Sequence, residues 1–316
     1  ADGSVGATVH QLGFDRFDAQ RSALRAAGVR ITGPSSRHTD GEATVSEDLE
    51  PEYIAVSSDS RRAWVSLQEN NAVAELDLTR PRVVNIYPLG FKNFRHRGND
   101  VAKLRVPSGT GLDASNSDGG ARIRHWPVVG MYQPDAIGLI QQRGREYLLT
   151  VNEGDARKYA AHDDRIRVRS LVASFPPQRQ RAFLLLTDEK HLGNLEVSAV
   201  GASSADRRHP LRCFGTRSFS VWRIPGADSP GRELQQVFDS GNDFESITAA
   251  QIPARYNADN EQESAADMRS PQRGPEPEGL ALGKVGSALL AAIGLERTGG
   301  VMLYDVTSPT IPAFVT

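Results

Sequence analysis

The chain reads LEPEYIA at residues 49–55 and AWVSLQE at residues 63–69, and the pattern of these two segments occurs twice more. The other copies are YQPDAI at 132–137 with YLLTVNE at 147–153, and GPEPEGLA at 274–281 with LLAAIGLE at 289–296. Each copy has a proline, an acidic residue, a strand-like run, a turn, a second run and a closing acid. The acids are 17, 18 and 18 residues apart, the length of two short strands and a tight turn. Both acids of each copy are therefore expected at the same end of a hairpin.

Two more strand-like segments follow each hairpin, so each copy predicts a four-stranded antiparallel meander, the blade of a β-propeller. The outer strands are expected at 72–78 and 83–89, at 218–224 and 234–240, and at 301–306 and 313–316. We therefore predict an all-β fold, one propeller segment over 1–316. Its blades are expected at about 43–90, 132–240 and 244–316, with long polar insertions at about 94–126, 156–216 and 253–274.

Three blades are fewer than the roughly four to eight of a closed propeller. A further strand is expected at 7–13, as the outer strand of another blade. The sequence thus predicts a partial arc, a fragment whose uncovered blade faces need the remainder of the propeller or another chain as partner. The alternative is that a long insertion contains a degenerate fourth blade.

Composition excludes several function classes. The formal net charge is −2 and the arginines are scattered, so neither nucleic acid nor an anionic membrane is an expected partner. No run of 18 apolar residues occurs, which argues against direct membrane insertion. Cys213 is the single cysteine, so neither an internal disulfide nor a cysteine zinc site is expected. No signal peptide is visible, and a start at Ala1 is typical of a mature or trimmed product.

The acids of the repeat are the candidate metal ligands, because pseudo-symmetry would bring them toward one face of a central channel. Carboxylates that face one another repel unless cations lie between them, and hard oxygen ligands suit Ca²⁺ or Mg²⁺. Gln68 and Asn70 lie beside these acids and add possible ligands. The sequence predicts a divalent-metal site, with calcium the expected ion, at Glu52, Glu69, Asp135, Asn152, Glu153, Glu278 and Glu296. The alternative is that these acids pair with arginines such as Arg157, Arg217 and Arg297, and tie neighbouring blades together.

The segment NEGDAR at 152–157 is the densest group of chemistry-bearing residues. It places an amide, two carboxylates and a guanidinium on one loop after a strand, and Gly154 would let the backbone approach a ligand closely. The alternative interpretation is a loop closed by its own Asp–Arg pair. The motifs of serine hydrolases, P-loop NTPases, dinucleotide-binding dehydrogenases and zincins do not occur.

Several strings together resemble the choice-of-anchor I domain family. They include EPEYIAVSSDSRRAWVSLQENNAVAELDL from 50, GLDASNSDGG from 111, LLTVNEGDAR from 148, DSGNDFESITA from 239, and GPEPEGLALG from 274 with AAIGLERTGGVMLYDVTSP from 291. The family includes mesenchyme-specific cell-surface glycoproteins of biomineralising animals and proteins labelled alkaline-phosphatase-like. The resemblance implies a fuller propeller that is extracellular, periplasmic or anchored at the cell surface.

Two functions follow. The first is a non-catalytic, cation-binding surface or matrix module, which needs only the clustered carboxylates. The second, implied by the family label, is a metal-dependent phosphoesterase acting on a small anionic or phosphorylated ligand. Its candidate catalytic residues are Glu153, Asp155, Arg157 and Arg217, with an arginine stabilising the developing charge.

Overall fold

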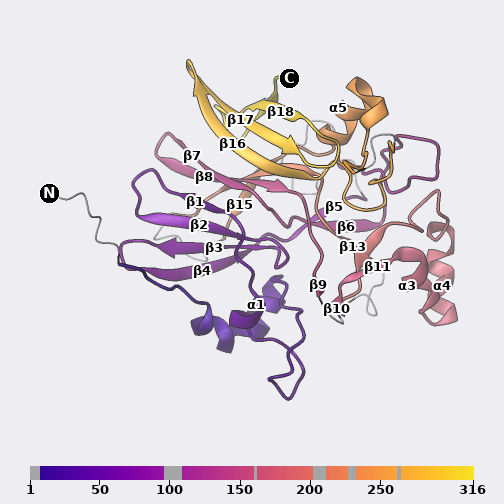
Figure 1. The fold of residues 1–316 in the computed structure, drawn as a ribbon, viewed down its shortest axis with the longest axis horizontal. Coiled ribbons are helices and arrows are strands. Elements are labelled where there is room, and N and C mark those ends of the chain that lie inside the picture. The colour runs from indigo at the N-terminus through magenta and orange to yellow at the C-terminus, as the bar shows by residue number, and fades with distance from the viewer. Residues whose placement is uncertain (1–7, 96–108, 160–161, 202–210, 227–232, 262–264) are drawn as a thin grey trace.

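The computed structural model describes residues 8–95, 109–159, 162–201, 211–226, 233–261 and 265–316 (Figure 1). The prediction of an all-β class is confirmed: most elements are strands, and no sheet in the described part of the chain closes on itself. The three predicted meanders are present as four-stranded antiparallel sheets. The first contains β1 (Ile54–Val56), β2 (Arg62–Leu67), β3 (Ala72–Asp77) and β4 (Arg82–Pro88).

The other two meanders have the same plan. In the second meander, a long segment separates strand 145–152 from strand 218–223, at the position of the predicted insertion 156–216. The second meander contains β7 (Ile137–Gln142), β8 (Arg145–Asn152), β14 (Ser218–Arg223) and β15 (Gln235–Asp239). The third contains β16 (Pro277–Val285), β17 (Ala288–Leu295), β18 (Val301–Asp305) and β19 (Ala313–Phe314).

These three sheets pack face to face, so two apolar layers lie between them, and in Figure 1 they fan out from β4 to β18. Trp64 and Tyr87 of the first sheet contact Leu148 and Trp222 of the second. On the other side of the second sheet, the Phe219 ring lies 4.7 Å from the Tyr304 ring of the third. Stacking of twisted sheets through such layers is the arrangement of propeller blades, here as a partial arc.

The predicted strand at 7–13 is wrong for residues 8–13, which form no strand; residue 7 lies outside the described residues. Val9 is 91% exposed, and although Leu12 packs against the core beside the first sheet, no residue in 8–13 gains a ladder partner. Instead, η1 (Asp15–Gln20) and α1 (Arg21–Ala27) cover the outer face of the first sheet. Phe17, which is 3% exposed, belongs to the same core cluster as Val65 and Ala74.

A fourth sheet, which we call the mixed sheet, has three of its five strands inside the predicted insertion 156–216. Its order is β11-β12-β13-β6-β5, and β13 pairs with β6 in parallel while the other pairs are antiparallel. The strands are β5 (Phe91–Asn93), β6 (Val128–Met131), β11 (Arg165–Arg167), β12 (Glu196–Ser198) and β13 (Leu211–Cys213). The described part of the insertion 156–216 therefore contains regular structure, and it shares an apolar core with β6 around Val128, Val197 and Leu211.

The remaining elements are short. They are α2 (Val45–Asp48), α3 (Val168–Ala173), α4 (Pro177–Phe183), η2 (Leu184–Leu186), α5 (Asp243–Gln251), η4 (Pro253–Arg255), and the pair β9 (Lys158–Tyr159) and β10 (His162–Asp163). None of the helices that the structure describes is long and apolar enough to cross a membrane.

Candidate functional site

Hairpin geometry brings the repeat's acids to one end of each meander. Glu52 donates its backbone N–H to Ser66 O at 3.0 Å, and Asp135 donates to Val151 O at 3.2 Å. In the third meander, the backbone N–H of Glu296 donates to Glu276 O at 2.9 Å. Each pair of segments is thus held side by side where its inner strand begins and its second strand ends. This common end of the three meanders is the candidate site. We call its acidic residues the acid cluster: Glu52, Glu69, Asp135, Glu153, Asp155, Glu276, Glu278 and Glu296.

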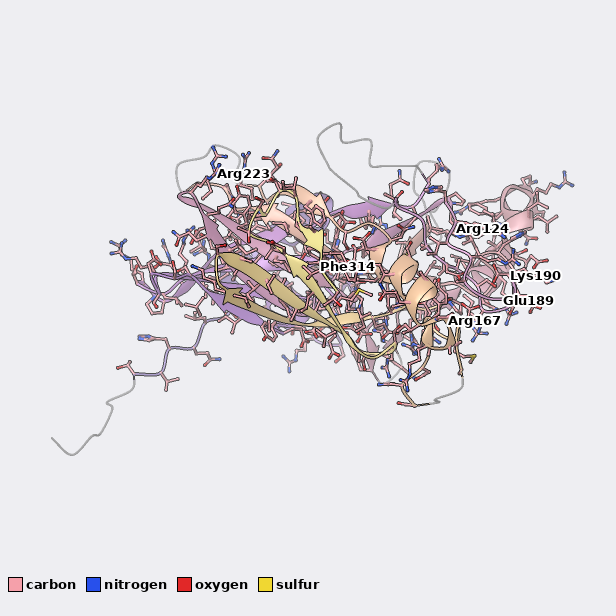
Figure 2. All side chains as sticks on the ribbon, turned by 90° about the horizontal axis from the view of Figure 1, so that it is seen from above. Arg124, Arg167, Glu189, Lys190, Arg223 and Phe314 are labelled. Carbon is pink, nitrogen blue, oxygen red and sulfur yellow. The ribbon has the colours of Figure 1, made fainter. Side chains whose placement is uncertain are left out.

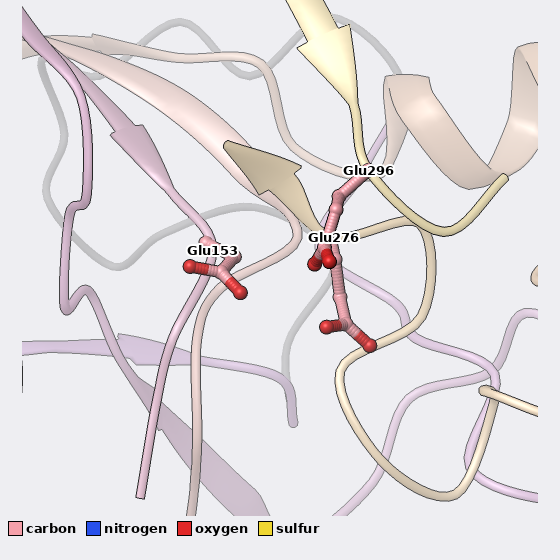
Figure 3. A group of neighbouring side chains, drawn as sticks. All are labelled: Glu153, Glu276 and Glu296. Atoms are coloured by element: carbon pink, nitrogen blue, oxygen red, sulfur yellow. The ribbon is translucent and has the colours of Figure 1, made fainter. Parts of the chain in front are cut away.

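Three carboxylates of the acid cluster approach one another closely. Glu153, Glu276 and Glu296 each offer one oxygen, and these three oxygens all lie within 4.8 Å of one another (Figure 3). Glu153 follows β8, whereas Glu276 precedes β16 and Glu296 follows β17. The triad therefore joins the second meander to the third.

Arginines lie among these acids. Arg273 Nη2 is 3.0 Å from Glu276 Oε2, and its Nη1 is 3.6 Å from Glu153 Oε1 and also pairs with Asp155. Arg269 Nε donates to Glu276 Oε1 at 2.7 Å. Arg297 Nη2 lies 3.2 Å from Glu296 Oε1, and its Nε lies 3.4 Å from Glu276 Oε2. Glu276, which is fully buried, is thus the centre of an ion-pair network.

The acids still outnumber the arginines, and the pKa values of Glu153 and Asp135 are raised, chiefly by burial. Burial raises the pKa of Glu153 to about 8; Arg273 and the Gln68 amide oppose the shift, while Glu276 and Asp155 add to it. Burial raises the pKa of Asp135 to about 6, with further contributions from Glu278 and Glu52. A cation at this end of the sheets would lower the cost of ionising these groups.

The other predicted ligands are placed differently. Glu52 is exposed over most of its surface. The partial burial of its carboxyl raises its pKa, and the charges of Glu50 and Asp155 add to the shift. Glu69 is partly buried, and its Oε2 atom has no hydrogen-bond partner; burial raises its pKa to about 7, and Glu50 and Glu52 add to the shift. Glu278 has no ion pair among the described residues, and its charge contributes to the raised pKa values of Asp135 and Glu296.

The structure does not bring two of the predicted amides to the acids. The Asn152 side chain is fully buried, donates to Ser220 Oγ at 2.9 Å and accepts from Thr150 Oγ1 at 2.8 Å. Asn70 likewise donates to Arg30 O and to Asp48. Gln68, by contrast, reaches the acid cluster and donates to Glu153 Oε2 at 2.7 Å.

The candidate catalytic arginines are committed elsewhere. Arg157 Nη1 lies 2.7 Å from Asp48 Oδ2, with both side chains buried. Arg217 Nη1 lies 2.6 Å from Glu245 Oε1, also fully buried. A guanidinium that stabilises a transition state must reach the substrate. Of the four candidates, Glu153 and Asp155 contact Arg273 within the acid cluster, and Arg157 reaches only its edge, where its Nε lies 3.4 Å from Glu50 Oε1.

Sequence reasoning missed Glu276, Arg269 and Arg273. A usable signal was present, because the residue before each repeat proline is Glu50, Gln133 or Glu276. In the structure Gln133 and Glu276 are both fully buried with positive φ, at 43° and 50°. Each carbonyl accepts a hydrogen bond at the end of the second strand: Gln133 O from Gly154 N at 3.1 Å, one residue past the closing acid, and Glu276 O from Glu296 N at 2.9 Å, the closing acid itself.

Comparison with known proteins places this geometry in context. Residues 1–309 match the Choice-of-anchor I domain. The chain is 26% identical over 329 aligned residues to the mesenchyme-specific cell surface glycoprotein of Strongylocentrotus purpuratus, covering 94% of this chain and 40% of that protein. It is 30% identical over 135 residues to gigasin-3a of Magallana gigas, covering 41% of this chain and 45% of that protein. The chain thus spans less than half the length of each of these relatives.

A solved structure, hydrazine synthase of Kuenenia stuttgartiensis, aligns with 86% of this chain and 69% of its own. The identity is 12% and the TM-score is 0.19.

Proposed function

The chain belongs to the Choice-of-anchor I domain family, and from this premise we propose that it is an extracellular or cell-surface propeller module that binds a divalent cation, calcium by its chemistry. The location is supported by the relative that is named as a cell surface glycoprotein. The cation is supported by the acid cluster, whose carboxylates come from neighbouring meanders.

The observation that carries the cation proposal is the triad of Glu153, Glu276 and Glu296, with one oxygen each within 4.8 Å of the others. Calcium–oxygen distances of about 2.3–2.6 Å allow two ligand oxygens to lie up to about 5 Å apart. Asp135 and Glu278 are close enough to interact electrostatically and can complete the six to eight oxygen ligands that calcium takes. Arg273 would have to give up its contact with Glu153 when the ion enters.

The competing interpretation is that the arginines already neutralise the acids and that the network only ties the meanders together. The two interpretations differ in one measurable respect. A bound ion stabilises the native state more as its free concentration rises above its Kd, with a logarithmic dependence, whereas an ion-pair network does not respond to calcium except through general screening.

The test is calorimetric titration of the chelator-treated chain with CaCl₂ and with MgCl₂, together with its melting temperature. We expect saturable heat with Ca²⁺ and a rise in melting temperature that Glu296→Gln and Glu153→Gln reduce. Glu189→Gln is the matched control, because Glu189 is exposed at one end of the molecule (Figure 2) and belongs to the insertion 156–216, not to a meander. Absence of both heat and a melting shift with either cation would overturn the proposal.

The phosphoesterase alternative is tested in the same samples. Sustained hydrolysis of p-nitrophenyl phosphate that requires the metal and is lost in Glu153→Gln would establish catalysis. The burial of Arg157 and Arg217 argues against it, since these were the groups expected to stabilise the phosphoryl charge.

We also propose that a further sheet, from the remainder of a propeller or from another chain, covers the outer face of the third meander. Val285 and Val301 are 66% and 62% exposed there, whereas a blade inside a closed ring packs on both faces. Sedimentation over a range of protein concentrations tests self-association. A chain that stays monomeric throughout would exclude a second copy as the covering partner.

A further inference from the structure

A cavity of about 540 Å³ lies between the segment that follows α1 and the mixed sheet, and one of its lining residues, Arg30, donates to the backbone carbonyl of Glu69 at 3.2 Å. Backbone of Gly28 to Pro34 forms one wall, and Phe91 and Arg212 belong to the other. A volume of about 300–1,000 Å³ is typical of sites for small organic ligands.

Strand register explains why Phe91 and Arg212 share a wall. On β6, Met131 pairs with Phe91 and Val129 pairs with Arg212. Because side chains alternate across a sheet, these four residues lie on one face of it. Their neighbours Val128 and Cys213 point to the opposite face, into the apolar core of the insertions. The face of the mixed sheet that lines the cavity therefore lies outside that apolar core, and polar side chains such as Arg212 can occupy it.

Two of the three arginines that line the cavity are neutralised. Arg30 pairs with Asp164 and donates to Ser198 Oγ at 3.2 Å and to Met131 Sδ at 3.1 Å. Arg25 Nη1 lies 2.5 Å from Glu42 Oε2. Three arginines thus line the cavity, and Asp164 and Glu42 already balance the charges of two of them.

Arg212 is different. Within the described part of the chain, its guanidinium has neither an ion pair nor a hydrogen bond, and it lies 4.9 Å from the centre of the Phe91 ring. Burial lowers its pKa, and no carboxylate opposes that shift. A partly desolvated charge without a counter-ion is costly to keep in a folded protein.

We propose that this cavity is a binding site for a small organic monoanion, with Arg212 forming a charge-assisted pair with the ligand's oxyanion. Carboxylate and sulfonate or sulfate groups share the required chemistry, since each presents two oxygens to the guanidinium fork. One uncompensated positive charge in the lining matches a single negative charge on the ligand. The apolar part of the ligand would pack against the partly exposed ring of Phe91. The site is independent of the acid cluster and of the cation proposed there.

The test is an NMR or calorimetric titration of the full chain with benzoate, benzenesulfonate and, as the uncharged comparison, benzyl alcohol. We expect both anions to bind and benzyl alcohol to bind at least roughly tenfold more weakly. Preference between benzoate and benzenesulfonate then identifies which oxyanion the site accepts. Failure of both anions to bind, or equal binding of benzyl alcohol, would overturn the proposal.

Two variants make the result specific. Arg212→Gln should weaken anion binding by roughly tenfold or more, and Arg212→Lys should lose less, because it keeps the charge without the fork. Arg167→Gln is the matched control, since Arg167 is exposed on β11 of the same mixed sheet (Figure 2).

The free protein gives an independent readout. Arg212→Gln should raise the melting temperature of the ligand-free chain, because it removes an unpaired, partly buried charge. A fall in melting temperature together with unchanged anion binding would mean that Arg212 only packs on Phe91, and would contradict the proposed site.

Discussion

The side-chain amide of Gln68 donates a 2.7 Å hydrogen bond to Oε2 of Glu153. Gln68 follows β2 of the first meander, and Glu153 follows β8 of the second, so this bond joins two neighbouring sheets at the acid cluster. The other oxygen of Glu153 faces Arg273, which also contacts Glu276 just before the third meander. Gln68 and Arg273 thus hold one carboxylate from opposite sides.

Replacing Gln68 should therefore destabilise the junction between the first two meanders. Gln68→Leu removes a buried hydrogen bond to a carboxylate, and we expect a loss of about 1–3 kcal/mol in the free energy of unfolding. Urea unfolding measures it. Gln251→Leu is the control, because Gln251 is exposed at the last position of α5, outside the first two meanders, and should cost no more than about 0.5 kcal/mol.

A double-mutant cycle separates the bond from general packing. Gln68→Leu and Glu153→Leu should couple by about 1 kcal/mol or more, because each removes one partner of the same contact. A coupling energy near zero would mean that Gln68 stabilises the junction by packing alone.

The Arg217–Glu245 pair should be among the most costly contacts to break. Arg217 Nη1 contacts Glu245 Oε1 at 2.6 Å, and its Nη2 donates to Ser270 O at 2.6 Å. Arg217→Met leaves Glu245 charged and buried, so we expect a loss of about 3–5 kcal/mol. The measurement is the unfolding free energy beside that of Arg223→Met, an exposed position labelled in Figure 2. A similar, small effect of both variants would contradict the assigned role of Arg217.

The meanders could be predicted from the sequence because their strands are long enough to carry a pattern. β2, β8 and β17 each have six to eight residues and a closing acid at a fixed spacing. The mixed sheet could not be predicted in this way. Four of its strands have three residues each, too short for alternation to be recognised. Its central parallel pair, β6 with β13, joins segments that are about 80 residues apart.

The acid cluster was only partly predictable for a related reason. Spacing identifies which acids return to one end of a hairpin, and it led to Glu153 and Glu296. Spacing does not indicate whether the residue before a repeat proline or the residue after it faces the neighbouring sheet. A register shift between Pro277 and Leu280, together with the positive φ of Glu276, directs this position inward. Asn152 was predicted as a ligand but does not reach the site. Because side chains alternate along β8, its amide lies on the face of the second sheet where it donates to the hydroxyls of Ser218 and Ser220.

Asp113 should make stability depend on pH. Burial and the nearby carboxylates of Glu245 and Asp267 raise its pKa to about 7, while backbone donors and the Tyr256 hydroxyl contact it. Because the folded pKa lies above the ordinary value of an aspartate, 3.8, the folded state holds this proton more tightly. Its contribution is largest below about pH 4 and is lost as pH rises to about 7.

Asp113→Asn isolates that contribution, because asparagine does not titrate. The unfolding free energy of the wild type minus that of the variant should fall between pH 4 and 7, by at most about 1.4 kcal/mol per pH unit, and then level off. Denaturant titrations at a series of pH values measure this difference. A difference that stays constant over that range would show that Asp113 is ionised throughout.

Gly154 should be the glycine whose replacement is most disruptive to the acid cluster. Its φ is +87°, and a Cβ atom there would lie 2.0 Å from the backbone nitrogen of Gly215. Gly154→Ala must therefore separate the loop after β8 from the segment before β14. The Gly154 carbonyl also accepts a 2.7 Å hydrogen bond from Arg273, so the displacement would reach the residue that contacts Glu153 and Glu276.

Gly144→Ala is the matched control for that variant, because Gly144 has a φ of +73° with nothing within 4 Å of the added Cβ. The left-handed backbone alone should cost about 1–2 kcal/mol there. Gly154→Ala should cost at least about 2 kcal/mol more, since backbone must move, and should also weaken any calcium response. Equal losses in the two variants would show that the close approach of Gly154 to Gly215 does not constrain the site.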